Sequence, residues 1–429
     1  MGLFNTFART VTVNNVAAGL TLLPPANGGP SLLRDWSTYQ TLDHLVGPPI
    51  EFSRGSTATF TGSNGLIQSA ATNAPRFDYD PITLACRGLL IEEARTNLLL
   101  QSQNFGTTWW ATTGMARTSG FVAPDGGSQA WSIVPSATTD FHRLSQSTSV
   151  VSGTSYTISV YAKANGYNFI RLEHGGIGVS QFNLQTGVVT YTEGSPVTSI
   201  INVGNGWFRC TMSKTSAAVG PVYIYPLATG AGSQNYTANG TSGVLLWGAQ
   251  VEEGAFATSY IPTTTATVTR SADVAQITGS NFTSLWNASA GAAYAVFQSN
   301  GNMASGSRYY NSRAIGYDNF SELLGSGGAS NKNVLAIYNP FSTPAVLNSA
   351  ISGADFTLAP VRGAMSYAST GRSLVGNGGT VVSDAGTIGA ITQFRFGMDN
   401  SGSWLNGWLS SIAYYRTRLT DAQLQTLTA

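Results

Sequence analysis

Charge, cysteine and histidine are all scarce in this chain, and the scarcity of charge is the most informative. Only 10% of the 429 residues are Asp, Glu, Lys or Arg, whereas about 25% are charged in an average globular protein. Glycine, at 49 residues, and many Ser, Thr and Asn residues stand in their place. A surface of this composition is typical of an extracellular or particle-bound β-protein.

The charges that are present nearly cancel. Lys plus Arg number 21 and Asp plus Glu number 20, so the chain has no global field that would attract nucleic acid or an anionic membrane. We therefore expect no nucleic-acid partner, and we expect any ligand to be held by neutral contacts.

Long apolar stretches are also missing. No apolar stretch of about 18 residues occurs, and no basic segment followed by an uninterrupted apolar one is present, which predicts neither a membrane span nor a signal peptide. An extracellular type of surface without an export signal is typical of a protein released by cell lysis. At 429 residues the chain is long enough for two or three domains, each with its own core.

The two cysteines, Cys86 and Cys210, allow one disulfide but form no disulfide framework and no metal-binding spacing. Strand alternation places Cys210 on the same face as Phe208 and Met212, which predicts a small, buried core residue. Whether the two cysteines pair is left open by the sequence.

Residues 1–45 differ in composition from the rest of the chain. A β-like run at 10–13 leads to a cluster of prolines and glycines at 24–30, and a short helix is expected over 32–36. The segment has too little apolar material for a core of its own, so it needs a partner surface to become ordered. We predict a docking arm.

Residues 46–100 are expected to form a small connector of short strands and turns. The run at 88–100 is apolar at both ends and is interrupted by Glu92, Glu93 and Arg95, which predicts a strand, a charged turn and a second strand. The connector is followed at residue 101 by a region with a different pattern.

Residues 101–262 alternate with period two. Tyr156, Ile158, Val160 and Ala162 would face inward from one strand. Further strands are expected around 168–173, 188–192, 207–213, 221–226 and 244–251. Short strands at this spacing with glycine-rich turns predict a β-sandwich of the jelly-roll type.

The segment 262–265 reads Pro-Thr-Thr-Thr and predicts an extended linker, so the last domain boundary is placed there. Residues 263–429 contain more strands and form a second sandwich, and Phe394, Phe396 and Met398 alternate with polar residues.

The chain closes with its one strong helix pattern. Thr420 and Gln423 fit a capping box, Asp421 suits the positive end of the helix dipole, and Leu419 can contact Leu424. The complete prediction is an all-β chain of tandem β-sandwich (jelly-roll) domains, with an extended N-terminal anchor and a short C-terminal helix.

Four segments carry a family resemblance: 51–59 (EFSRGSTAT), 73–81 (NAPRFDYDP), 88–100 and 247–262 (WGAQVEEGAFATSYIP). Together they span roughly residues 48–270 and resemble phage virion proteins described as tail fibre, head fibre or minor structural proteins. Residues 101–262 also look like a carbohydrate-binding-module jelly roll. Residues 394–427 are similar to the final strand and helix of concanavalin-A-like, laminin-G-type domains. The first 45 residues match no family known to us.

The resemblance implies a structural protein on the surface of the virion, attached to other virion proteins through residues 1–45. It also implies a host cell-surface glycan as the binding partner and, by analogy to fibres, a homo-oligomer such as a trimer. Attachment to the head and attachment to the tail remain equally open.

Glycoside cleavage needs two carboxylates facing each other across a groove. The candidates are the pairs Glu92-Glu93 and Glu252-Glu253, but adjacent residues of a strand point to opposite faces. We interpret each pair as part of an ion-paired turn, while one glutamate of each pair meeting the other across the fold stays open. No catalytic residue is assigned, and we expect a protein that is not an enzyme.

The three histidines, His44, His142 and His174, have no metal-ligand or triad spacing. We interpret them as polar surface or hydrogen-bonded residues. No phosphate loop and no nucleophile elbow occurs, and no spaced acidic loop supports calcium at Asp125 or Asp399. No metal and no cofactor are expected.

Aromatic side chains are the feature with a plausible binding role, because sugar rings stack their C–H faces on exposed Trp and Tyr. The candidates at expected turns or strand ends are Trp109, Trp110, Tyr167, Tyr309, Tyr310 and Trp404. Three functions compete on this basis: a receptor-binding adhesin, a purely structural decoration of capsid or tail, and a polysaccharide depolymerase. The shortage of acidic residues disfavours the depolymerase most.

Overall fold

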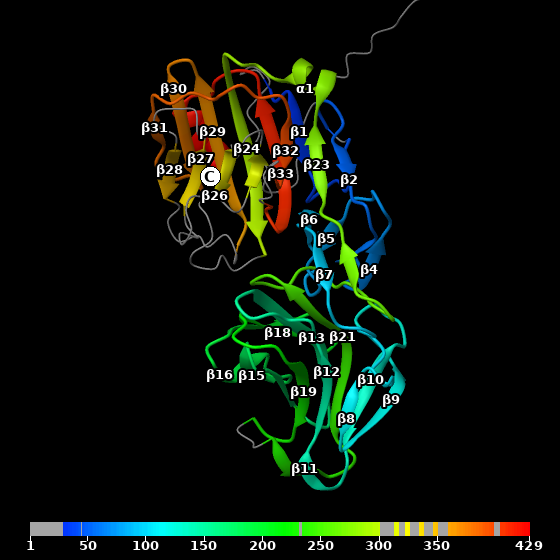
Figure 1. The fold of residues 1–429 in the computed structure, drawn as a ribbon. Coiled ribbons are helices and arrows are strands. Elements are labelled where there is room, and N and C mark those ends of the chain that lie inside the picture. Colours follow the sequence, from blue (N-terminus) through cyan, green and yellow to red (C-terminus); the bar gives the residue numbers. More distant parts are fainter. Residues whose placement is uncertain are drawn as a thin grey trace, which may run out of the picture.

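The computed structural model describes residues 29–43, 45–230, 234–300, 313–316, 322–326, 334–338, 346–350, 359–398 and 404–429. Strands dominate these residues, arranged in two β-sandwich modules with a short helix at the C-terminal end (Figure 1). The predicted all-β sandwich class and the closing helix are confirmed. No helix among the described residues is long and apolar enough to cross a membrane.

The first module is a jelly roll of two six-stranded antiparallel sheets. One sheet, which we call the covered sheet, has the order β17 (Val197–Asn202), β18 (Trp207–Thr215), β13 (Ser155–Asn165), β21 (Gly243–Glu253), β10 (Ala130–Pro135) and β9 (Met115–Phe121). The other, the open sheet, has the order β16 (Val188–Glu193), β15 (Gly178–Asn183), β14 (Phe169–His174), β19 (Pro221–Leu227), β12 (Arg143–Ser147) and β8 (Ala111–Thr113). A two-stranded ribbon of β11 (Thr139–Phe141) and β20 (Asn235–Thr237) lies at the far end of the module from β7 (Figure 1).

The jelly-roll core follows from the alternation that the sequence shows. Tyr156, Ile158, Val160 and Ala162 are all buried between the sheets, and the expected strands correspond to β14, β16, β18, β19 and β21. Cys210 is fully buried in this core, as predicted, and both cysteines are free thiols.

The second module packs an eight-stranded sheet on a seven-stranded sheet. The eight strands are β31 (Val382–Asp384), β30 (Gly371–Gly376), β29 (Val361–Ala368), β24 (Ala290–Ser299), β33 (Gly407–Tyr415), β6 (Cys86–Ile91) and β5 (Phe77–Tyr79), with β1 (Leu32–Asp35) also paired to β33. The seven are β2 (Glu51–Ser53), β23 (Val274–Ile277), β32 (Phe394–Phe396), β25 (Arg313–Gly316), β26 (Glu322–Ser326), β27 (Val334–Tyr338) and β28 (Val346–Ala350).

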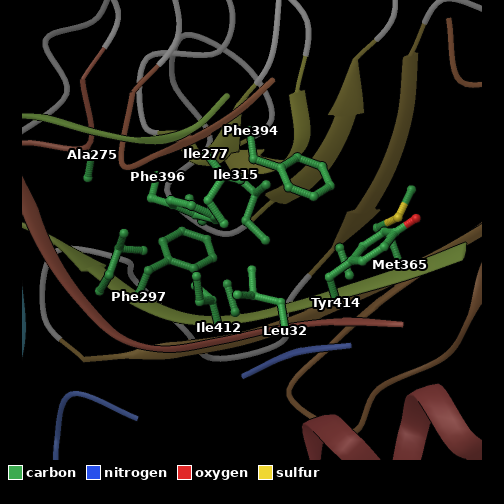
Figure 2. Close-up of a cluster of buried hydrophobic side chains, with 14 of the residues drawn as sticks. Leu32, Ala275, Ile277, Phe297, Ile315, Met365, Phe394, Phe396, Ile412 and Tyr414 are labelled. Carbon is green, nitrogen blue, oxygen red and sulfur yellow. The ribbon is translucent and has the colours of Figure 1, made fainter. Parts of the chain in front are cut away.

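Apolar side chains from both sheets meet between them (Figure 2). Leu32, Phe297 and Ile412 come from the eight-stranded sheet, and Ile277 and Phe394 come from the other. Each is at most 2% exposed, and burial of such a side chain contributes about 1.5–3 kcal/mol. The core of this module is therefore built by segments from both ends of the described chain.

The module boundaries differ from those expected at residues 45, 100 and 262. Strands β1, β2, β5 and β6 complete the sheets of the second module, so the segment expected to be a separate connector and the residues after 30 are part of that sandwich. The jelly roll is inserted between β6 and β23. The order of the segments along the chain suggests tandem domains. The pairing of β1 and β6 with β33 joins residues that are far apart in the sequence, so local patterns do not show it.

The chain reaches and leaves the jelly roll through two short paired strands, β7 (Arg95–Asn97) and β22 (Val268–Arg270). The strand, charged turn and strand expected at 88–100 are confirmed as β6, residues 92–94 and β7. A small hairpin of β3 (Ala58–Thr61) and β4 (Ile67–Ala70) lies beside this junction (Figure 1).

The helix expected over 32–36 is wrong, because residues 32–35 form β1. Leu32 pairs with Tyr414 and Leu33 with Ala413, and all four residues of the strand are buried. The helical preference of two leucines is a weak prior that tertiary pairing overrides. Residues 32–35 of the expected arm therefore belong to the chain's own second module, and residues 1–28 lie outside the described part of the chain.

The C-terminal helix α2 (Asp421–Thr428) has the predicted capping box of Thr420 and Gln423. Leu419 and Leu424 are buried in one cluster, as expected. A second helix, α1 (Gly279–Leu285), was not predicted. Its N-cap Thr278 makes no side-chain capping bond, so the usual local pattern for a helix start is missing there.

A cluster of buried ions, which we call the junction cluster, joins the modules. Arg54 Nη1 lies 3.0 Å from Asp273 Oδ1, and Arg76 donates both to Asp273 and, over 2.8 Å, to Glu92 Oε2. Arg270 Nη1 lies 3.4 Å from Glu92 Oε2. All five side chains are at most 3% exposed, so these charges are held almost without water.

The jelly roll joins the cluster through the segment after β21. Ser259 donates its backbone N–H over 2.8 Å and its hydroxyl over 2.7 Å to the Glu92 carboxylate. Burial alone would raise the pKa of Glu92, but Arg270, Arg76 and Ser259 together lower it to about 2. Glu92 is therefore ionised throughout the neutral range, and the inserted module is fastened by charge-assisted bonds.

Replacing Asp273 tests the junction cluster. Asp273→Asn leaves Arg54, Arg76 and Arg270 with less negative charge, so we expect a loss of about 3–5 kcal/mol in the free energy of unfolding. Denaturation in urea, followed by tryptophan fluorescence, measures it. Asp421→Asn, at an exposed helix start, should lose at most about 1 kcal/mol. Equal losses in the two variants would contradict the structural role of the cluster.

Candidate functional site

The aromatic residues singled out from the sequence lie in very different surroundings. Trp109 is 49% exposed, whereas Trp110 is 1% and Tyr167 is 8% exposed. Trp404 is half-buried and donates its indole N–H to the Asp273 carbonyl over 3.2 Å. Tyr309 and Tyr310 lie outside the described residues.

Trp110 and Tyr167 were therefore wrong as sugar-stacking candidates. The Trp110 ring lies 4.9 Å from that of Phe105, and its indole N–H donates to the Gln101 carbonyl. Tyr167 packs against Tyr236 in the same core. Both lie in loops, as expected from the local sequence, but their side chains are part of the jelly-roll core.

One glutamate of each acidic pair accepts hydrogen bonds from the same short segment, residues 258–259, and both have a structural role. The Glu252 carboxylate accepts from the backbone N–H of Thr258 over 2.9 Å and from its hydroxyl over 2.6 Å. Glu92 accepts from the next residue, Ser259. Both carboxylates are buried and hydrogen-bonded, so they do not face each other across a groove. Glu92 pairs with Arg76 and Glu93 pairs with Arg95, so the ion-paired interpretation is confirmed for these two residues. It is wrong for Glu252, which accepts its hydrogen bonds from Thr258.

The described histidines are buried and hydrogen-bonded. His142 contacts the carbonyls of Gly114, Thr138 and Tyr236, and His174 contacts Gly220. His44 lies outside the described residues, as does Asp399.

Asp125 accepts from the Gly127 N–H in a tight turn. Among the residues that the structure describes, no group of three His, Cys, Asp or Glu could hold a metal ion.

The outer face of the open sheet carries an aligned row of polar and aromatic side chains. Tyr225 pairs with Arg171, Arg171 with Gln181, and Gln181 with Tyr191 across four neighbouring strands. Arg143 on β12 extends the row, with its Nη1 3.4 Å from the Tyr225 hydroxyl. Neighbouring strands lie about 4.8 Å apart, so the row spans roughly 19 Å.

A second row runs beside the first, two residues along each strand. Ser145 pairs with Tyr223, Tyr223 with Glu173, Glu173 with Val179 and Val179 with Glu193. Tyr223 and Ser145 are half-buried and Glu193 is exposed. We call the two rows together the tyrosine–arginine face.

Arginines and tyrosines brace each other on this face. The Arg143 guanidinium lies 4.6 Å from the centre of the Tyr223 ring, and that of Arg171 lies 5.8 Å from the Tyr225 ring. These cation–π contacts hold flexible side chains in defined positions. Tyr191, at the other end of the row, is 44% exposed and donates its hydroxyl to Glu193.

Glu173 is held from two sides. Arg171 donates to its Oε2 from Nε over 2.9 Å and from Nη2 over 2.7 Å, and Gln234 donates over 3.1 Å. Next to Arg171, the buried Oε1 of Gln181 has no hydrogen-bond partner among the described residues. An unpaired buried acceptor is costly, so it favours any donor that can reach it.

Trp109 lies at the margin of the same sheet. It precedes Ala111 by two residues, and Ala111 pairs with Ser145 at the edge of the tyrosine–arginine face. The one predicted aromatic that is exposed in the described jelly roll therefore adjoins this face.

The covered sheet is less accessible at its centre, because aromatic side chains cover its outer face there. Trp247, Tyr161 and Tyr260 pack there with ring centres 4.6–6.2 Å apart. Arg209 stacks on Tyr161 and donates to the Thr258 carbonyl over 2.7 Å. The segment after β21 thus covers the centre of one face of the jelly roll, whereas the other face is exposed at Tyr191 and Glu193 and half-buried at Arg143 and Tyr223.

A small cleft of about 120 Å³ lies between the modules. Asp78 is buried in its wall, where it accepts from the Thr61 N–H over 2.6 Å and from the Trp408 indole over 2.8 Å. Burial raises the pKa of Asp78 to about 6, against the opposing effects of Thr61, Arg87 and Trp408. The cleft is smaller than the 300–1,000 Å³ typical of ligand pockets, so the tyrosine–arginine face is the stronger candidate site.

The raised pKa of Asp78 can be observed at Trp408. Because the indole N–H donates to this carboxylate, its NMR resonance should shift with a midpoint near pH 6, the carboxyl being protonated below it. Asp78→Asn should abolish the shift. A Trp408 resonance that stays constant between pH 4 and 8 in the unmodified protein would contradict the assignment.

The residues of the tyrosine–arginine face were not predicted from the sequence. Alternation within β14 and β19 does show Arg171, Glu173, Tyr223 and Tyr225 on the side opposite the core residues. That pattern marks an outward face, but the register that aligns four strands is a tertiary property. The available sequence pattern was the alternation itself, which places Arg171 and Glu173 in one strand and Tyr223 and Tyr225 in another opposite the apolar residues.

Comparison with known proteins gives only distant likenesses. No family model matches the chain, and no curated protein matches it. Among solved structures, a protein from Bacteroides ovatus described as carbohydrate-binding is 12% identical, with 68% of this chain and 80% of that chain covered and a TM-score of 0.24.

Two further structures have similar scores. Trypanosoma rangeli sialidase in complex with sialic acid is 9% identical, with 70% of this chain and 60% of that chain covered and a TM-score of 0.26. Domains LG4-5 of the mouse laminin α1 chain are 7% identical, with 77% and 93% covered and a TM-score of 0.20. At such scores the likenesses carry no argument about function, which must come from the residues of the site.

Proposed function

We propose that this chain is a non-enzymatic glycan-binding protein that holds an oligosaccharide on its tyrosine–arginine face. The observation that carries the proposal is the alignment of Tyr, Arg, Gln and Glu side chains across the outer face of a rigid sheet, where Tyr191 is exposed and Arg143, Glu173 and Tyr223 are half-buried. Tyrosines present flat apolar rings to the C–H faces of sugars. Amide, carboxylate and guanidinium groups offer paired hydrogen bonds to hydroxyls.

The dimensions favour a chain of sugars over a single one. The row of roughly 19 Å across the strands is longer than one sugar ring, and it reaches solvent at both ends, at Tyr191 and at Arg143, while Tyr225, Arg171 and Gln181 between them are buried. A site on strands is also more rigid than one on loops, which limits the entropy lost on binding.

We further propose that the protein is part of a phage virion and displays the jelly roll at the particle surface. This rests on the sequence resemblance of the segments at 51–59, 73–81, 88–100 and 247–262. In this proposal, attachment to other virion proteins uses the N-terminal residues before β1, and copies of the chain associate as a homo-oligomer, such as a trimer. The low charge of the surface supports close self-association.

A purely structural decoration protein is the second candidate. It is favoured by the same resemblance and needs no ligand on the tyrosine–arginine face. Depolymerase activity is disfavoured, because Glu92 and Glu252 are both buried and hydrogen-bonded. The binding experiment below separates the first two candidates.

Tyrosine substitutions test the binding face. Tyr191→Ala and Tyr223→Ala should each weaken glycan binding about tenfold, because each removes a stacking ring. Tyr191→Phe and Tyr223→Phe keep the ring and should stay within about threefold of the unmodified protein. Binding is measured on a glycan array and on host cells with the full chain. Folded protein that binds no glycan and no cell would favour the decoration role.

A further inference from the structure

We propose that the glycan held on the tyrosine–arginine face is acidic, and that Arg143 binds its carboxylate. The inference rests on the proposed function of that face and adds the chemical class of the ligand. It also departs from the expectation of neutral contacts, which came from the balance of charge over the whole chain.

Charge on the face is balanced at one arginine and unbalanced at the other. Arg171 makes a two-point ion pair with Glu173. Arg143 makes no ion pair among the described residues, and its side-chain hydrogen bond there is the 3.4 Å contact of Nη1 with the Tyr225 hydroxyl. A guanidinium has five N–H donors, so most of those on Arg143 remain available.

Arg143 is also held in place without a carboxylate. Its guanidinium stacks 4.6 Å from the Tyr223 ring centre, and its side chain is half-buried. A positioned guanidinium loses less freedom on binding than a mobile lysine would. Its planar fork matches the two oxygens of a carboxylate, which is the geometry of a strong charge-assisted pair.

No free acid lies close enough to compete for Arg143 among the described residues of the face. Glu173 is occupied by Arg171 and Gln234. Glu193 lies on β16, four strands from β12, or roughly 19 Å away, which is beyond the screening length of about 8–10 Å at physiological salt. A ligand carboxylate at Arg143 therefore meets attraction, opposed in part by Glu173 two strands away, whose charge also acts on Arg143.

The hydroxyl groups around Arg143 suit the rest of a sugar acid. Ser145, on the same strand and the same face, is half-buried, whereas Tyr225, whose hydroxyl lies beside the guanidinium, is only 1% exposed. A hydroxyl both donates and accepts hydrogen bonds, so Ser145 can hold a ring hydroxyl next to the carboxylate. Further along the row, Tyr191 supplies a stacking surface for a second sugar.

Matched pairs of glycans test the inference with the full chain. Each acidic oligosaccharide containing a uronic or sialic acid is compared with its carboxyl-reduced form, in which the carboxylate is a primary alcohol. The acidic form should bind at least tenfold more tightly at low salt. The preference should be lost in Arg143→Gln and partly kept in Arg143→Lys. Arg418→Gln, an exposed site on the second module with the same change of charge, should behave as the unmodified protein.

The outcomes separate the two proposals. Equal binding of acidic and reduced forms would overturn the acidic class and leave glycan binding intact, whereas absence of all glycan binding would overturn both. If Arg143→Gln still binds the acidic form more tightly than the reduced form, another cation holds the carboxylate, and the role of Arg143 is overturned. Tighter binding of sulfated than of carboxylated glycans would overturn the carboxylate assignment. Unchanged thermal unfolding of the variants confirms that they are folded.

Discussion

The buried junction cluster is the constraint on which the arrangement of the molecule depends. Glu92 and Asp273 are placed almost without water among Arg54, Arg76 and Arg270. Removing charges from water is tolerable only when every partner is present. The five residues come from segments as far apart as 54 and 273, so the cluster can form only when the early strands, the jelly roll's two connecting strands and the second module are assembled together.

This constraint explains where the motifs of the sequence lie. Arg54, Arg76, Glu92 and Ser259 each belong to one of the four segments that carry the family resemblance. All four converge on the junction cluster. The segments that carry the resemblance are therefore those that join the modules, and none of them contains a residue of the tyrosine–arginine face. Architecture and recognition are carried by different residues of the same chain.

The two sheets of the jelly roll show how the junction also sets the site. The segment that delivers Ser259 to Glu92 continues to Tyr260, which packs with Trp247 and Tyr161 over the covered sheet. One face is thereby buried by the chain itself. On the opposite face, Tyr223 and Arg143 are half-buried and keep contact with solvent. Because no further hydrophobic core covers them, they can contact a ligand.

The sequence by itself determined the all-β class, the inward residues from Tyr156 to Ala162, the buried Cys210 and the capped helix after Thr420. These follow from periodicity and capping, which act within a few residues of the chain. Only the tertiary structure decided that residues 32–35 are a strand, that the jelly roll is an insertion, and that Trp109 is exposed while Trp110 is buried. It alone assembled the tyrosine–arginine face, because strand order and register depend on pairings between residues that are distant in sequence.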